Sequence, residues 1–189
     1  MLEVRIHGRG GQGVVTAAEL LSSAAFLGGR HAQAFPTFGS ERTGAPVVAF
    51  CRIADPPIRT REPIAHPGIL IVQDPTLLHQ VDVFAGLRDD GIVLLNTART
   101  PEELGLADLV DRLESGRVLT VPATELGREH LGRPMPSAAL LGAFAAVTNA
   151  VTIGALERAL RERFAGRVAE GNVGAARAGH ALLAEVPAC

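Results

Sequence analysis

The apolar positions of this chain fall either in short continuous runs or in longer stretches with helical spacing. The short runs predict strands at residues 4–6, 31–35, 47–53, 68–74, 91–97 and 117–121. Stretches in which apolar residues recur every three or four positions predict helices at residues 14–27, 76–81, 101–113, 124–131, 138–148, 153–164 and 168–183. Strands and helices therefore alternate along most of the chain, and helices alone fill its last third.

The connection between the second and third predicted strands differs from the others. Residues 37–46 are rich in turn formers and show no helical pattern, so these two strands are expected to pair as an antiparallel hairpin. The later runs at 68–74 and 91–97 are dominated by apolar residues, as expected of parallel strands that are buried on both faces. The pattern predicts an α/β fold, a three-layer α/β/α sandwich with a mostly parallel sheet, an early β-hairpin insertion and a helical C-terminal third. We expect residues 1–189 to form a single domain.

Composition narrows the location and the classes of partner. Hydrophobic residues make up 47% of the sequence, yet no stretch reaches the length of a membrane span. The first residues run directly into a strand and do not resemble a signal peptide, which favours a cytoplasmic protein with no membrane contact. A formal net charge of −2 gives no case for binding nucleic acid.

The residues that carry metal or nucleophile chemistry are sparse. The two cysteines, Cys51 and Cys189, fall short of the four thiolates that an iron–sulfur cluster needs. The six histidines show no metal-binding spacing, and there is no G-x-S-x-G motif around a serine. We therefore expect no metal site and no catalytic residue in this chain.

Gly8-Arg9-Gly10-Gly11-Gln12-Gly13 satisfies the dinucleotide-binding pattern G-x-G-x-x-G between a strand and a helix. Backbone N–H groups in such a loop suit a phosphate, a carboxylate or the backbone of a partner, and a tight turn alone also accounts for the glycines. A bound dinucleotide is the least favoured of these readings. The acidic residue that would bind its ribose is missing after the second strand, and the chain turns back there through a hairpin.

Other polar residues lie where a ligand could meet the sheet. The segment Ser40 to Arg42 is a polar cluster between two apolar strands, and Arg42 could bind an anion there. Gln73-Asp74 and Asn96-Thr97 follow buried strands, at the edge where open α/β sheets bind ligands. For Asp74 we favour the simpler role of a helix N-cap.

A resemblance to a known family extends over the chain. Its segments, in order, are HGRGGQGVVTAAELL, QAFPTFGSERTGAPVVAFCRI, ILIVQDPTLL, GRPMPSAALLGAFAAVT and AEGNVGAARAGHALL. They resemble the gamma subunit of pyruvate:ferredoxin oxidoreductase (pyruvate synthase) and of related 2-oxoacid:acceptor oxidoreductases. The resemblance implies a part in the oxidative decarboxylation of pyruvate or a related 2-oxoacid, with transfer of the acyl group to coenzyme A and of the electrons to ferredoxin. Alpha and beta subunits would hold thiamine diphosphate and Mg²⁺, and a delta subunit would hold further [4Fe-4S] clusters.

The resemblance also implies a role for two loops, as a wall of the coenzyme A site or as a contact with other subunits. The residues concerned are Gly8, Gly10, Gly11, Gln12, Gly13, Phe38, Gly39, Glu41, Arg42 and Gly44. The isolated chain is expected to be inactive. Two alternatives stay open: a gamma subunit of a branched-chain 2-oxoacid or phenylglyoxylate oxidoreductase, which could pass electrons to NAD through another subunit, and a purely structural assembly subunit. An independent nicotinamide or flavin enzyme is disfavoured by the missing ribose-binding acid.

Overall fold

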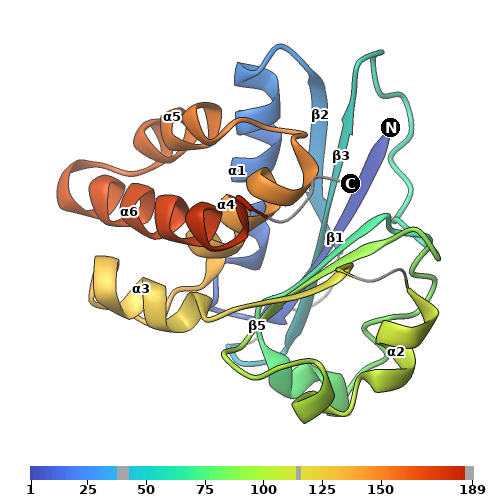
Figure 1. Ribbon diagram of the computed structural model, residues 1–189. Helices are drawn as coiled ribbons and strands as arrows, with labels where there is room; N and C mark the ends of the chain where they lie inside the picture. Colours follow the sequence, from blue (N-terminus) through green and yellow to red (C-terminus); the bar gives the residue numbers. More distant parts are fainter. Residues whose placement is uncertain (38–42, 114–115, 186–189) are drawn as a thin grey trace.

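The computed structural model describes residues 1–37, 43–113 and 116–185. In this part of the chain six strands form one sheet in the order β2-β3-β1-β4-β5-β6 (Figure 1). The strands are β1 (Leu2–Arg9), β2 (His31–Pro36), β3 (Pro46–Ala54), β4 (Ile69–Val72), β5 (Ile92–Asn96) and β6 (Val118–Val121). Strands β1, β4, β5 and β6 are parallel, whereas β3 pairs antiparallel with both β1 and β2. The predicted hairpin is confirmed, and the structure adds that β3 lies between β2 and β1.

The helices lie unequally on the two faces of the sheet. They are α1 (Val14–Leu27), α2 (Ala107–Arg112), α3 (Ala123–Leu131), α4 (Ser137–Thr148), α5 (Ile153–Arg163) and α6 (Gly166–Leu183), with the 3₁₀ helices η1 (Pro75–His79) and η2 (Glu102–Leu104). Helix α2 lies on one side of the sheet and α1 and α3–α6 lie on the other (Figure 1). This arrangement confirms the predicted sandwich and its helical C-terminal third.

Alternation along the central strands divides the core into two clusters. Ile71 of β4 and Leu94 of β5 point into the cluster beneath α1 and α4. Leu70 and Leu95, one residue away from them, point into the cluster beneath η1 and α2. Both faces of these strands are buried, so apolar residues occupy every position except Asn96 at the end of β5, and this is the pattern that predicted the strands.

The helical side is two helices deep. Helices α1 and α4 contact the sheet, and α6 packs on α4 from outside. Glycines make this close approach possible, because a Cβ atom at Gly142 would overlap the carbonyl oxygen of Ala176, and one at Gly179 would overlap that of Ala139. Helix α4 is accordingly buried along almost its whole length, so its apolar surface is used within the chain.

Several predicted elements change in detail. Helix α1 has the predicted ends, between Gly13 and Gly28. The predicted helix at 76–81 is the shorter η1, and the predicted helix at 101–113 is divided into η2 and α2 at Gly105, whose φ of 73° breaks the helical path. Among the described helices, none combines the length and the hydropathy that crossing a membrane requires.

Candidate functional site

The glycine loop connects β1 to α1 at the carboxyl edge of the parallel strands. Gly11 and Gly13 have φ values of 93° and 75°, which side chains other than glycine rarely adopt. Gly8 lacks room for a side chain instead, because a Cβ there would lie 2.6 Å from Cγ2 of Val14. Backbone geometry and packing therefore account for three of the four glycines in the segment from Gly8 to Gly13, without any ligand.

Arg9 and Gln12 turn inward from the loop and bind Asp74 at the end of β4. Asp74 Oδ2 accepts hydrogen bonds from Arg9 Nε at 3.0 Å and from Gln12 Nε2 at 2.8 Å. Its other oxygen accepts from the backbone N–H of Thr76, which confirms the predicted N-cap. Burial opposes ionisation of Asp74, but hydrogen bonds from Thr76 and Gln12 and the charge of Arg9 outweigh it and lower the pKa of this carboxyl. The loop is thus fastened to a carboxylate on the neighbouring strand.

The Arg9 guanidinium also joins the loop to two other segments. Its Nη1 donates to the carbonyl of Gly44 at 3.0 Å, and its Nη2 donates to Thr76 Oγ1 and Gln80 Oε1 at 2.7 and 2.9 Å. The candidate residues proposed from the sequence did not include Arg9. The sequence alone contains no signal for this role, because Arg9 reaches Asp74 only when β1 and β4 are neighbours in the sheet.

The turn between β2 and β3 faces the glycine loop. Gly10 donates its N–H to the carbonyl of Ala45 at 2.9 Å, and Gly44 donates back to the carbonyl of Gly10 at 3.1 Å. Gly10 and Thr43 also form an isolated bridge. The other candidate residues of this turn, Phe38, Gly39, Glu41 and Arg42, lie outside the described residues.

A second row of polar groups continues along the same edge. Asn96 Nδ2 donates to the carbonyl of Gln73 at 2.7 Å and to Thr124 Oγ1 at 2.8 Å. Gln73 Nε2 donates to Ser137 Oγ at 3.2 Å, and Ser137 Oγ donates to the carbonyl of Gln12 at 3.0 Å. The predicted residues Gln73, Asp74 and Asn96 therefore lie at this edge, and Asn96 binds Gln73. Oε1 of Gln73 is buried and has no hydrogen-bond partner among the described residues.

The outer side of the loop is where a ligand or partner could make contact. A hollow of about 370 Å³ lies here, open to solvent, and its lining includes Gly10, Gly11, Gly13, Val47 and Met135. Within the described residues, the N–H groups of Val14, Val15 and Thr16 in the first turn of α1 donate to no protein atom. Unpaired N–H groups at the positive end of a helix suit an anion. The geometry can therefore position an anionic group, and no pair of side chains among the residues described at this site is arranged for acid–base catalysis.

Other titratable groups are not suited to chemistry at this edge. His7 is buried on β1, and burial, together with the charge of Arg5, lowers its pKa to about 4. Cys51 is buried, which raises the pKa of its thiol to about 12. Across the described ranges, no three His, Cys, Asp or Glu side chains come close enough together to hold a metal ion.

Comparisons with known proteins cover nearly the whole chain. Residues 3–182 match the family model "Pyruvate ferredoxin/flavodoxin oxidoreductase". Pyruvate synthase subunit PorC of Methanothermobacter marburgensis is 49% identical over 177 residues, which are 94% of each chain. The pyruvate/ketoisovalerate oxidoreductases common subunit gamma of Pyrococcus furiosus is 48% identical over 179 residues, again 94% of each chain.

Solved structures show the same similarity. The crystal structure of pyruvate oxidoreductase subunit PORC from Thermotoga maritima superposes with a TM-score of 0.80 at 34% identity, covering 95% of each chain. A 2-oxoglutarate:ferredoxin oxidoreductase from Magnetococcus marinus matches all of this chain with 32% of its own, with a TM-score of 0.75. At 17% identity, that second match supports the fold alone.

Proposed function

Because the chain belongs to the pyruvate ferredoxin/flavodoxin oxidoreductase family, we propose that it is the gamma subunit of a multisubunit 2-oxoacid:acceptor oxidoreductase. The complex would oxidatively decarboxylate pyruvate or a related 2-oxoacid and form an acyl-CoA, with ferredoxin as electron acceptor. The observation that carries this proposal is the end-to-end match with relatives named as PorC or gamma subunits, at close to half identity. Residues 1–189 would serve as one gamma domain in a cytoplasmic complex.

Other subunits would carry the cofactors in this proposal. Thiamine diphosphate and Mg²⁺ are assigned to the alpha and beta subunits, and additional [4Fe-4S] clusters to the delta subunit. This chain has only two cysteines, and burial raises the pKa of the Cys51 thiol to about 12, which disfavours the thiolate that a cluster needs. Its residues do not fit an iron–sulfur cluster, so no electron-transfer step is assigned to it.

The chain's own contribution would be to position coenzyme A or a neighbouring subunit. Gly10, Gly11 and Gly13 form the outer wall of the loop, beside the unpaired N–H groups of α1. A phosphate group of coenzyme A is an anion of the kind that such N–H groups bind. Gly8 and Gln12 would support the loop from inside, since Gly8 packs on Val14 and Gln12 binds Asp74. Phe38, Gly39, Glu41, Arg42 and Gly44 stay part of the proposed wall.

The first test is to purify the native complex through a tag on this chain. Mass spectrometry should find alpha, beta and delta subunits with it. A dye of low reduction potential should be reduced when pyruvate and coenzyme A are both present. Recovery of the tagged chain alone, without activity, would contradict the proposal.

The name of the relative from Pyrococcus furiosus is a reason to test more substrates than pyruvate. Its name describes a gamma subunit common to pyruvate and ketoisovalerate oxidoreductases. The assay should therefore include ketoisovalerate and phenylglyoxylate, with NAD as an alternative acceptor. Activity with a branched-chain substrate and none with pyruvate would identify the second candidate enzyme.

A second test separates a coenzyme A wall from a purely structural subunit. Gly11→Ala adds a methyl group that faces open space at a φ of 93°, next to the hollow. Gly29→Ala is the matched control, because it has a φ of 82°, equally open surroundings and a position at the other end of α1. We expect Gly11→Ala to raise the KM for coenzyme A about fivefold or more relative to the control, with kcat little changed, as loss of substrate binding predicts. An equal KM in the two assembled variants would favour the structural role.

A further inference from the structure

A second hollow lies beside the glycine loop, between the first half of α1 and the start of α6. We call it the α1–α6 groove. Its volume is about 210 Å³, and its lining includes Thr16 and Leu20 of α1, Met135, Phe164, and Val168 of α6. Gly13, Thr16 and Met135 line both this groove and the hollow over the glycine loop, so the two surfaces are continuous.

The lining of the groove is apolar and reaches the surface. Val168 is 53% exposed, although α6 buries its neighbour Ala169. Met135 supplies a flexible side chain at the junction with the glycine loop, and methionine adapts readily to an apolar partner. A groove of this size is smaller than the roughly 300–1,000 Å³ of typical pockets for small-molecule ligands. It suits one large apolar side chain rather than a whole cofactor.

The rim of the groove carries unbalanced positive charge. Its lining residues include Arg133 and Arg163 and no carboxylate. Neither arginine side chain forms an ion pair with any of the described residues, and the Arg163 guanidinium lies over the ring of Phe164, 5.6 Å from its centre. By contrast, Arg161 of α5 and Arg177 of α6 are paired with Glu157 or Glu170. Arg133 and Arg163 therefore place positive charge beside the groove, where neither is paired with a carboxylate of the described residues.

We propose that the α1–α6 groove binds a segment of a partner subunit that places one large apolar side chain in the groove and a carboxylate near Arg133 or Arg163. The inference rests on the proposed function, since it requires partner subunits. The two arginines favour an acidic segment, because opposite charges on two partners attract each other. Buried large apolar side chains and arginines are also the residues that contribute most of the binding energy in many interfaces. A partner that binds over the glycine loop would also contact this groove, because the two hollows are adjacent.

Photo-crosslinking in the assembled complex tests the proposal directly. Val168→p-benzoylphenylalanine places the reactive group at the groove. The same replacement of Leu182, which is 52% exposed and lies about 21 Å further along α6, is the control. We expect Val168 to crosslink to one peptide of a partner subunit that contains Asp or Glu near the reacted residue, and Leu182 not to react with that peptide.

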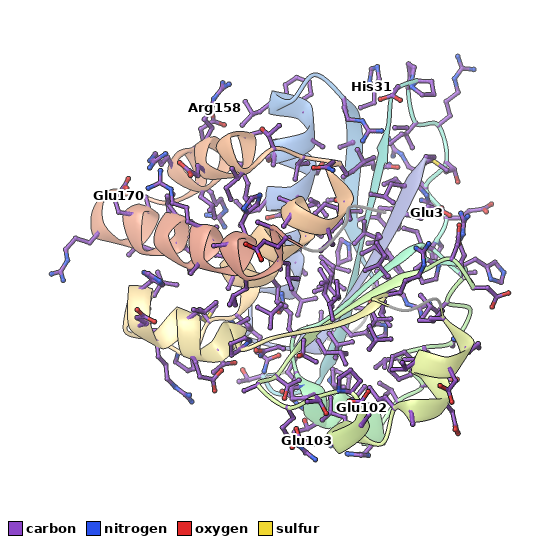
Figure 2. The ribbon with its side chains drawn as sticks, in the orientation of Figure 1. Glu3, His31, Glu102, Glu103, Arg158 and Glu170 are labelled. Carbon is purple, nitrogen blue, oxygen red and sulfur yellow. The ribbon has the colours of Figure 1, made fainter. Side chains whose placement is uncertain are left out.

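Charge reversal gives an independent readout. Combining Arg133→Glu with Arg163→Glu should reduce the amount of partner subunit recovered through the tag about tenfold or more in moderate salt. Arg158→Glu is the control, because Arg158 lies on the outer side of α5 and points to solvent (Figure 2). It should leave recovery unchanged.

The outcomes distinguish this inference from the proposed function. If the unmodified chain recovers no partner subunits, the proposed function fails. If it recovers them but the groove variants match their controls, the groove proposal alone is wrong. Crosslinks from Val168 only to this chain, to a second copy of it or to a small molecule would also overturn the groove proposal.

Discussion

Arg9 joins more segments of the candidate site than any other described residue considered above. Its guanidinium contacts a carboxylate after β4, a carbonyl in the turn before β3 and two side chains of the segment at 76–80. These contacts use the planar fork of arginine, which presents donors in several directions at once. The position of the glycine loop therefore depends on the side chain of Arg9.

Arg9→Lys should destabilise the chain although it keeps the charge. A lysine ammonium can reach Asp74 or the carbonyl of Gly44, but not all four acceptors together. We expect the free energy of unfolding in urea to fall by roughly 1–2 kcal/mol. Arg30→Lys is the control, because Arg30 pairs with Asp55, whose side chain is 83% exposed. It should change stability by less than about 0.5 kcal/mol, and an equal effect of the two variants would contradict the role of Arg9.

His7 gives the fold a dependence on pH. Its pKa is lowered to about 4 in the folded chain, against about 6.5 when unfolded, so the unfolded chain binds more protons between these values. Stability therefore falls as the pH drops from about 6.5 to 4. The test compares His7→Leu with His31→Leu, a control at an exposed position that retains His7. Urea unfolding at pH 7 and pH 4.5 should show that the control loses on the order of 3 kcal/mol more of its free energy of unfolding over this interval than His7→Leu does. Parallel pH profiles of the two variants would show that His7 is accessible to protons when folded.

At the scale of elements, the contact between α4 and α6 determines how the outer helices are held. The backbones of the two helices approach so closely that Gly142 and Gly179 cannot carry a side chain. Alanine is the better helix former by about 1 kcal/mol, so packing overrides helix propensity at both positions. Helix α6 in turn supplies one wall of the α1–α6 groove.

Gly142→Ala should therefore destabilise the chain by about 2 kcal/mol or more, because its Cβ would press on the carbonyl of Ala176 and separate the helices. Gly154→Ala in α5 is the matched control, since a Cβ there meets no atom within 4 Å. We expect the control to be neutral or stabilising by up to about 1 kcal/mol. Thermal unfolding of both variants measures the difference, and similar midpoints would refute the close packing.

Local sequence signals predicted the elements whose ends are defined by glycines or other turn-forming residues. Helix α1 lies between two glycines and was predicted in full, and the turn-rich segment predicted the hairpin. The division of the helix at 101–113 was missed because helical periodicity continues through Gly105. The inward role of Arg9 could not be predicted, because it depends on β1 and β4 being neighbours, and the order of strands is a property of the whole chain.

At the scale of the whole molecule, the sheet is covered differently on its two faces. Helices stacked two deep cover one face, whereas on the other face a loop rather than a helix packs beside β1. Arg5 of β1 points to that second face and donates hydrogen bonds to the carbonyls of Val83 and Ala85. Its guanidinium thereby holds the loop segment over the sheet.

Hydrogen exchange should follow the order of the strands. Amides of β1 and β4, at the centre of the sheet, should exchange slowest because opening them requires global unfolding.

At the edge strand β2, the direction of the N–H groups alternates along the chain. The N–H of Thr37 donates to the carbonyl of Val48 and so points toward β3, which means that the N–H groups of Ala32 and Ala34 point away from β3. We expect these two amides to exchange at least about tenfold faster than those of Gln33 and Phe35 in the isolated chain, measured by NMR. Equal protection would mean that the edge of β2 is covered.

The position of β3 between β2 and β1 has a consequence for the order of folding. The hairpin of β2 and β3 joins residues that are close in the sequence, so it can form early. Strand β1 must wait for distant partners, since Leu2 pairs with Ile53 and Val4 pairs with Ile69. Closing these long loops is slow, because the entropy cost is incurred before the contacts are gained. The first residues of the chain, and the glycine loop that follows them, are therefore expected to reach their final shape late, when β1 enters the gap between two strands that formed without it.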